Sequence, residues 1–497
     1  MNLGVLQAEF GWHKEAVATM LEAVQTAREN SDNTCLNFAL NWFFHFGRAH
    51  PGLVAELENN SMLGTGKETL VYLRAKAKES GMDPLWSSTL LSEAKLLMSN
   101  GESVATAMEQ MVKSSQLIVS RNMLAMMGPQ LSIAATLWDR LGVAYMSGMT
   151  SEVFLRVHAR NAVFDDELKV TCRLAGQLAG KGRYEEAFAK IESLDRNALR
   201  SVKPSQHWHV YRGLLKLRRD LHRNDLVAAE QLLAQLLQAA GSSHRGGNGG
   251  GSGLEPDMAL VVDSLHIEML TRKGDYETAF NKIDRLITEL REDNRDIALR
   301  VRLLLNKAHL FDVVGRPQRG FTVAMRAASL AWRARLLPLV WQAVGALANI
   351  LNELGEYEGA ANLLVAVLPR CLETDSRYTA GELYALLADS WMGMAGDSGG
   401  GAEDNNKKTG TGTGTGGGSR GGGRVECMKK ANEVLDSALK HFAAVEDFEK
   451  RSEMLAKKAT IMKSLGDEKL AEDYAARYLA LRREQKEAAA SAVAFGV

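Results

Sequence analysis

The sequence is poor in proline and cysteine, and it carries no net charge. Its 497 residues include only 8 prolines and 4 cysteines, and Lys plus Arg and Asp plus Glu both total 60. A zero charge balance argues against general nucleic-acid binding and against an acidic or basic tail. Because proline interrupts helices, its scarcity favours a chain that is almost entirely helical.

The cysteines and the apolar segments exclude two further classes of protein. The cysteines lie far apart and form no Cys-x-x-Cys pair: Cys35, Cys172, Cys371 and Cys427. We therefore expect buried free thiols in a reducing compartment rather than a disulfide framework. Residues 1–10 lack a basic start and a continuous apolar core, so no secretory signal is expected. The most apolar run, 336–351, is interrupted by Gln342 and Asn349 and is too short to span a bilayer, so we predict an intracellular soluble protein.

The stretch Leu347–Pro369 has the pattern of a helical hairpin. Apolar residues recur at helical spacing up to Gly355, a residue that readily takes the left-handed conformation closing a helix. A second apolar stripe then runs to Pro369, which should mark the end of the second helix. Ala360 is small where two antiparallel helices would cross, and Tyr357 lies beside the turn. These features are typical of a tetratricopeptide-type hairpin.

The same turn recurs along the chain. Each copy begins with glycine or asparagine and has a small residue five positions later, and some copies also have a tyrosine two positions after the first residue. The copies are Gly11 with Ala16, Gly182 with Tyr184 and Ala187, Asn224 with Ala229, Gly274 with Tyr276 and Ala279, Gly315 with Gly320, Gly355 with Tyr357 and Ala360, and Gly466 with Ala471. The steps from 274 to 315 to 355 are 41 and 40 residues, longer than the ~34-residue period of a standard tetratricopeptide. Because one hairpin cannot bury its apolar faces alone, we predict an all-α fold, a superhelical solenoid of tetratricopeptide-like hairpins.

The order of these patterns divides the chain into segments. We expect a first repeat with an exposed front end at 1–46, degenerate helical repeats at 47–166, hairpins at 167–240, a Gly-rich loop at 241–253, further hairpins at 254–395, a disordered Gly-rich insert at 396–424 and C-terminal hairpins at 425–497. Within the degenerate part, the pattern predicts helices at Pro84–Met98, Glu102–Met127 and Pro129–Met146.

The first helix presents apolar residues from its start. Leu3, Leu6 and Phe10 form a stripe, and no capping repeat with a polar outer face precedes them. We therefore expect either that the chain is the C-terminal part of a longer protein or that it docks on a partner here. The aromatic residues between Cys35 and Phe46 are expected to form core.

Only weak candidates for a catalytic, metal or cofactor site occur. Residues 64–67 resemble part of a phosphate-binding loop, but Glu68 stands where Ser or Thr is needed. His207 and His209 are two residues apart and would face different directions on a helix, which favours packing over chelation. Residues 410–424 contain only two arginines and no aromatic platform for RNA. We predict no enzyme, no catalytic residue, no cofactor, no metal and no small-molecule substrate.

The N-terminal region carries a more specific pattern. It contains in order Asn2-Leu3, Phe10-Gly11, Ala16, Leu21-Glu22-Ala23, Ala27, Ser31-Asp32, Cys35-Leu36 and Trp42. This order resembles the start of the tetratricopeptide region of anaphase-promoting complex subunit 5, and the later order of hairpins is similar. The additional N-terminal helical domain of that family is absent, and the two Gly-rich inserts are extra.

The resemblance implies a non-catalytic platform subunit of a large cullin–RING-type ubiquitin ligase that controls mitotic progression and exit. It also implies a location in nucleus and cytoplasm. The implied partners are the largest scaffold subunit, subunit 4 and the cullin–RING module, with no nucleic acid and no membrane.

Two other functions stay open at this point. A peptide-binding adaptor or co-chaperone would need Lys and Asn at matching positions on successive helices, and Asn306-Lys307 and Asn349 do not recur in phase. An enzyme or signalling ATPase with a helical sensor domain would need its catalytic part in additional sequence.

Overall fold

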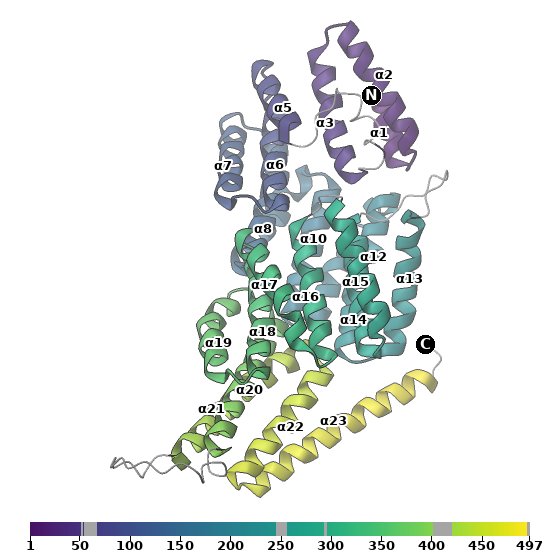
Figure 1. The fold of residues 1–497 in the computed structure, drawn as a ribbon. Helices are drawn as coiled ribbons and strands as arrows, with labels where there is room; N and C mark the ends of the chain where they lie inside the picture. The colour runs from purple at the N-terminus through teal and green to yellow at the C-terminus, as the bar shows by residue number, and fades with distance from the viewer. Residues whose placement is uncertain (51–52, 54–66, 245–255, 293–295, 401–419, 495–497) are drawn as a thin grey trace, which may run out of the picture.

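The computed structural model describes residues 1–50, 53, 67–244, 256–292, 296–400 and 420–494, and every regular element in these ranges is a helix. The first helices are α1 (Asn2–Glu9), α2 (His13–Glu29), α3 (Asn33–Ala49), α5 (Lys67–Glu79), α6 (Asp83–Asn100), α7 (Val104–Ser120), α8 (Leu124–Arg140), α9 (Ala144–Val153), α10 (Phe164–Gly180), α11 (Tyr184–Glu192), α12 (Val202–His222) and α13 (Leu226–His244). The others are α14 (Pro256–Lys273), α15 (Tyr276–Glu292), α16 (Ile297–Val313), α17 (Pro317–Arg333), α18 (Leu337–Glu353), α19 (Tyr357–Leu372), α20 (Arg377–Gly400), α21 (Arg420–Val445), α22 (Phe448–Leu465) and α23 (Glu468–Ala494). Short π- and 3₁₀-helical turns lie at Phe154–His158, Ala159–Asn161 and Ala198–Arg200. Neighbouring helices pair as hairpins, and the hairpins stack into a superhelix (Figure 1).

Left-handed residues close the predicted hairpin turns. All seven turn residues predicted from the sequence have a positive φ, from 58° at Asn224 to 86° at Gly11. This conformation reverses the chain within a few residues, and glycine adopts it without the steric penalty of a Cβ atom. The chain is therefore an all-α solenoid of tetratricopeptide-like hairpins.

Part of the segment predicted to be degenerate continues the spacing of the other hairpin turns. Gly101 and Gly142, with φ of 69° and 74°, close two hairpins that the pattern missed. Gly142 follows Gly101 by 41 residues, and Gly182 follows Gly142 by 40 residues. Ser147, five residues after Gly142, is fully buried in the position that alanine holds in other copies. Extending the 40-residue spacing backwards from Gly182 would have found both turns.

Three helix boundaries predicted in this segment are wrong. The helix predicted to reach Met146 ends at Arg140, because the left-handed turn at Gly142 separates α8 from α9. The helix predicted at Glu102–Met127 ends at Ser120, because Asn122 takes the left-handed conformation with φ of 52°. Asparagine tolerates this conformation better than most residues. Helix α8 then begins at Leu124, so Pro129 lies inside it instead of starting a helix. Proline removes one helical hydrogen bond, and packing on neighbouring hairpins is sufficient to keep the helix intact.

Other helices extend beyond their predicted ends. Pro369 lies inside α19, which continues to Leu372. The margins of the insert predicted at 396–424 are helical, because α20 reaches Gly400 and α21 starts at Arg420. The rest of that insert, and most of the Gly-rich loop predicted at 241–253, lie outside the described residues.

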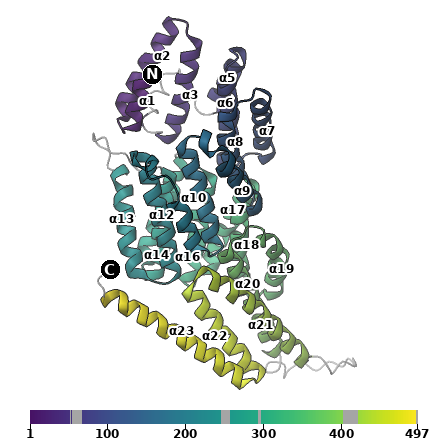
Figure 2. The ribbon, with the colours of Figure 1, turned by 180° about the vertical axis from the view of Figure 1, so that it is seen from behind.

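The superhelix brings distant hairpins together in two rows. We define the first row as α6–α13 and the second row as α16–α22. Helices α8–α12 lie behind α14–α18 in Figure 1 and in front of them in Figure 2. The turns of the first row contact the second row: Gly101 lies against Ile297 and Ala334, Gly142 against Pro338 and Thr374, and Gly182 against Ala444. The two rows therefore close on each other through the hairpin turns.

Candidate functional site

The predicted turn residues are spread over the solenoid and do not meet at one place. The alanines at the predicted crossings Ala16, Ala187, Ala279 and Ala360 are completely buried, and Ala471 is half-buried. Tyr184 is 2% exposed, whereas Tyr276 and Tyr357 are half-buried. The ring of Tyr357 occupies the space that a side chain at Gly393 would need. These residues pack hairpins together.

Where the rows meet, a polar network joins α12 to the turn between α21 and α22. Arg219 Nε and Arg223 Nε lie 3.0 and 2.7 Å from Glu446 Oε2. His222 Nδ1 and Asp447 Oδ2 are 3.0 Å apart, and Asp447 is completely buried. At least 223 positions separate the partners in the sequence. We call this network the row junction.

The row junction holds its carboxylates in the charged form. Burial alone would raise the pKa of Asp447, but hydrogen bonds from His222 and from the backbone N–H of Lys450 bring it below the usual value. The pKa of Glu446 is also lowered, because hydrogen bonds from Arg219 and Arg223 outweigh burial. Asp447 in addition caps α22, since its Oδ1 accepts from Lys450 N at 2.8 Å.

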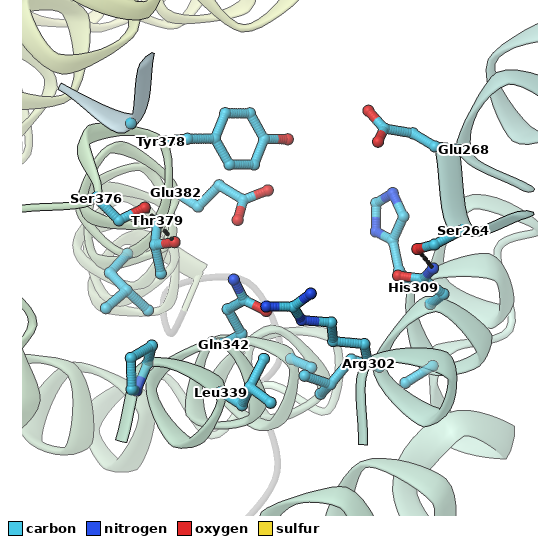
Figure 3. A pocket seen from close by; sticks show the side chains of 18 of the residues that line it. Ser264, Glu268, Arg302, His309, Leu339, Gln342, Ser376, Tyr378, Thr379 and Glu382 are labelled. Atoms are coloured by element: carbon cyan, nitrogen blue, oxygen red, sulfur yellow. Dashed lines mark hydrogen bonds between the residues drawn. The ribbon is translucent and has the colours of Figure 1, made fainter. Parts of the chain in front are cut away.

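An interior cavity of about 760 Å³ lies between the rows. Its wall is formed mainly by α8, α12, α14, α16, α18, α20 and α22. In Figure 3, Glu268 from α14, His309 and Arg302 from α16, Gln342 from α18 and Glu382 from α20 surround one part of it. The cavity therefore presents polar side chains of both charges.

The surroundings of these groups in the cavity wall shift their pKa values. Burial raises the pKa of Glu382, which Lys450 partly offsets. Burial also lowers the pKa of His309 and of Arg302, and the positive charge of Arg218 adds to the effect on Arg302. Arg302 lines the cavity and is exposed to solvent there. Such a wall can hold polar groups of either charge through hydrogen bonds and ion pairs.

The described residues do not assemble a recognisable reactive centre. Within these residues, no group of three His, Cys, Asp or Glu side chains is placed to hold a metal ion. Burial raises the pKa of the Cys172 thiol to about 12 and that of Cys371 to about 11, which makes both poor nucleophiles. Among the described helices, none is long and apolar enough to cross a membrane.

The weak candidates from the sequence have ordinary surface or packing contacts where the structure describes them: His209 is exposed, and the ring of His207 stacks on that of Tyr211. Between His207 and His209, the Trp208 indole donates to the Ile191 carbonyl at 3.0 Å. Of the phosphate-loop candidate, only its end is described: Lys67 begins α5 and its Nζ lies 2.9 Å from Glu102 Oε2.

The residues considered for peptide capture are engaged within the chain. Asn306 Nδ2 donates to Ser264 Oγ at 3.0 Å, and Asn349 Nδ2 donates to Asp312 Oδ1 at 2.6 Å. Lys307 forms an ion pair with Asp284 on α15. They do not converge on one carboxylate site.

Comparisons with known proteins return one family twice. Residues 1–50 match the family model of anaphase-promoting complex subunit 5. Anaphase-promoting complex subunit 5 of Schizosaccharomyces pombe is 24% identical over 211 residues, which are 42% of this chain and 27% of that protein. Over these stretches the chain is similar in sequence to anaphase-promoting complex subunit 5. The resemblance found in the N-terminal pattern is confirmed, and the match to the subunit 5 of fission yeast spans about a quarter of that protein's length.

Solved structures of helical-repeat proteins resemble the chain only loosely. A Rap protein in complex with competence and sporulation factor gives a TM-score of 0.39 at 12% identity, covering 95% of this chain and 99% of that one. Yeast Tom70 gives a TM-score of 0.32 at 13% identity, covering 94% and 96%. These values support no argument about detailed geometry or function.

The row junction was missed from the sequence. Its residues follow no local motif, because each partner is an ordinary charged residue on a helix and the contact depends on the curvature of the whole superhelix.

Proposed function

We propose that this chain is a non-catalytic scaffold subunit of the anaphase-promoting complex. The observation that carries the proposal is the match of residues 1–50 to the subunit 5 family model. The two-row superhelix supports it, because a solenoid closed on itself holds its outer helices at fixed distances from one another. A rigid outer surface of this kind suits a protein that positions other subunits.

In this proposal the complex is a cullin–RING-type E3 ubiquitin ligase that acts in mitotic progression and exit. The chain contacts the largest scaffold subunit, subunit 4 and the cullin–RING module in nucleus and cytoplasm. It binds them through protein surfaces and carries no cofactor.

The front helices offer one such surface. Leu3 and Leu6 on α1 are 57% and 50% exposed, and Phe10 and Trp12, which follow α1, are 61% and 55% exposed. Apolar residues grouped in this way on a folded surface mark partner sites or aggregation liabilities. We assign this surface to contact with a neighbouring subunit.

Affinity purification from dividing cells tests the proposal. The tagged chain should recover the other subunits of the complex in near-stoichiometric amounts, as measured by quantitative mass spectrometry. The double variant Phe10→Ser/Trp12→Ser should reduce this recovery, whereas Val112→Ser/Val119→Ser on α7, where both valines are also exposed, serves as the matched control. Recovery of chaperones or unrelated proteins without subunits of the complex would refute the assignment.

A further inference from the structure

Helix α17 has an exposed apolar line. Its buried side consists of small residues: Gly320, Ala324, Ala327 and Ala331. On the other side Phe321, Met325 and Trp332 are 46%, 46% and 50% exposed. Steps of four and seven residues place these three side chains in one line along the helix, as on the seam of a coiled coil.

A line of arginines runs beside the apolar line, further round the exposed surface of α17: Arg326 and Arg333 directly follow Met325 and Trp332, so they lie about 100° round the helix from them. Arg319, Arg326 and Arg333 recur every seven residues and are all exposed. None of these three guanidinium groups has an ion-pair or hydrogen-bond partner among the described residues. The sequence from 313 to 352 contains no Asp or Glu. The chain itself therefore leaves this basic line without counter-charges nearby in sequence.

Helix α15, the outer helix of the preceding hairpin, provides a matched contrast. Lys282 Nζ lies 2.8 Å from Asp263 Oδ1, and Arg285 Nε lies 2.8 Å from Glu289 Oε1. Asp284 is paired with Lys307. None of the large apolar residues on α15 whose side chains are described is exposed. Its outer face is neutralised and polar, which is the ordinary state of an outer helix facing water.

We propose that the outer face of α17 binds an amphipathic helix of a partner protein whose apolar edge is flanked by Asp and Glu. That helix lies over the strip between the two lines, so that leucine-like residues on one edge pack against Phe321, Met325 and Trp332 while carboxylates on its other edge pair with the arginine line. From Arg319 to Arg333 the face is about 20 Å long, which fits about four helical turns. Tryptophan and arginine are the residue types that most often dominate binding energy at interfaces.

This inference is separate from the assignment to the anaphase-promoting complex, because it concerns one helix face and the chemistry of its ligand. A partner helix docked side by side uses the apolar line and the arginines together. A ligand that recognises charge alone would not need the apolar line.

Two designed peptides test the proposal by fluorescence anisotropy with the full chain. Both are helical, about 18 residues long, with leucine at the seam positions; one carries glutamate at the flanking positions and the other lysine. The glutamate peptide should bind at least about tenfold more tightly than the lysine peptide. The variant Arg326→Glu/Arg333→Glu should reverse this order, and Phe321→Ser/Met325→Ser should weaken both peptides. The matched control is Arg285→Glu on α15, which should leave the affinities of both peptides unchanged.

All these positions are exposed, so circular dichroism should show unchanged helicity in each variant. Equal affinity of the unmodified chain for the two peptides would overturn the proposal. So would a loss of affinity in Arg285→Glu as large as that in the α17 variants. So would failure of the glutamate peptide to bind while anionic vesicles or duplex RNA bind in a manner abolished by Arg326→Glu/Arg333→Glu. Recovery of the complex by the tagged chain is measured independently and distinguishes a failure here from a failure of the proposed function.

Discussion

Hairpin turns of two kinds share one backbone conformation but have opposite surroundings. The docked turns are Gly101, Gly142 and Gly182, with φ of 69°, 74° and 82°, and the open turns are Gly274, Gly315 and Gly355, with φ of 83°, 74° and 83°. A methyl group would meet its nearest neighbour in the second row at 2.8 Å at Gly101 and 3.0 Å at Gly142, and at Gly182 it would overlap the carbonyl oxygen of Ala444. Nothing lies within 4 Å at the open turns. Local sequence thus sets the conformation of a turn, and the superhelix decides whether that turn is also an interface.

The largest effect should come from a methyl group at the tightest docked turn. At Gly182 the methyl would overlap the backbone carbonyl of Ala444, which cannot move without separating the rows. Alanine at position 182 would also be strained by the left-handed backbone conformation. Together the overlap and the strain should lower the free energy of unfolding of Gly182→Ala by about 2–5 kcal/mol. In the open-turn control Gly274→Ala only the backbone strain applies, and the free energy of unfolding should fall by about 1–2 kcal/mol. Thermal unfolding and protease resistance measure both, and equal losses would remove the distinction between docked and open turns.

The row junction should be the next most sensitive point. Asp447→Ala removes a helix cap and leaves His222 buried without its partner, which together cost about 2–4 kcal/mol. Because the pKa of Asp447 is lowered in the folded chain, its contribution is complete above the unfolded pKa of about 4 and is lost as pH falls through the folded value. Asp447→Asn should therefore lose stability at neutral pH and show a weaker dependence on pH below about 4. Hydrogen exchange should increase in α12 and α22 and remain unchanged in α1–α3. If the stability of Asp447→Asn fell with pH below about 4 as steeply as that of the unmodified chain, this role of Asp447 would be contradicted.

An open hairpin can be disturbed without touching the docked turns. Ala360 and Ala279, which the sequence predicts at helix crossings, are completely buried, so Ala360→Trp and Ala279→Trp should each lower the free energy of unfolding by about 1–3 kcal/mol through overpacking. The loss should spread to adjacent hairpins, since repeats share their interfaces. Hydrogen exchange resolves the affected helices. Full protease resistance and helicity in both variants would show that the crossings are not at these alanines.

The sequence predicted the solenoid because its determinants are local. A glycine with φ near 83°, as at Gly274, and a small residue such as Ala279 at the crossing are visible in a short window. The break at Asn122 was missed because asparagine gives a weaker turn signal than glycine. The contacts of Gly182 with Ala444 and of His222 with Asp447 depend on the sum of small rotations between many hairpins. No short pattern encodes such a sum.

The smallest effect on stability is expected outside both kinds of turn, on the front surface. Phe10 is 61% exposed and Trp12 55% exposed, so Phe10→Ser and Trp12→Ser should change stability by no more than about 0.5 kcal/mol. We expect the isolated chain to self-associate through residues 1–46 and these variants to reduce that association. Light scattering over a range of concentrations measures it. A concentration-independent monomer in the unmodified chain would show that this surface is not adhesive.

Zero-length cross-linking tests most directly whether the two rows close on each other. Lys181 Nζ, beside the docked turn at Gly182, lies 2.8 Å from Asp375 Oδ2 between α19 and α20. A carbodiimide should join these two side chains within one molecule, as mass spectrometry of the monomer fraction would show. The pair Lys307 and Asp284, which lies on neighbouring hairpins, should cross-link whether or not the rows close. Both cross-links together are the predicted result, and the second without the first would mean that the superhelix is open in solution.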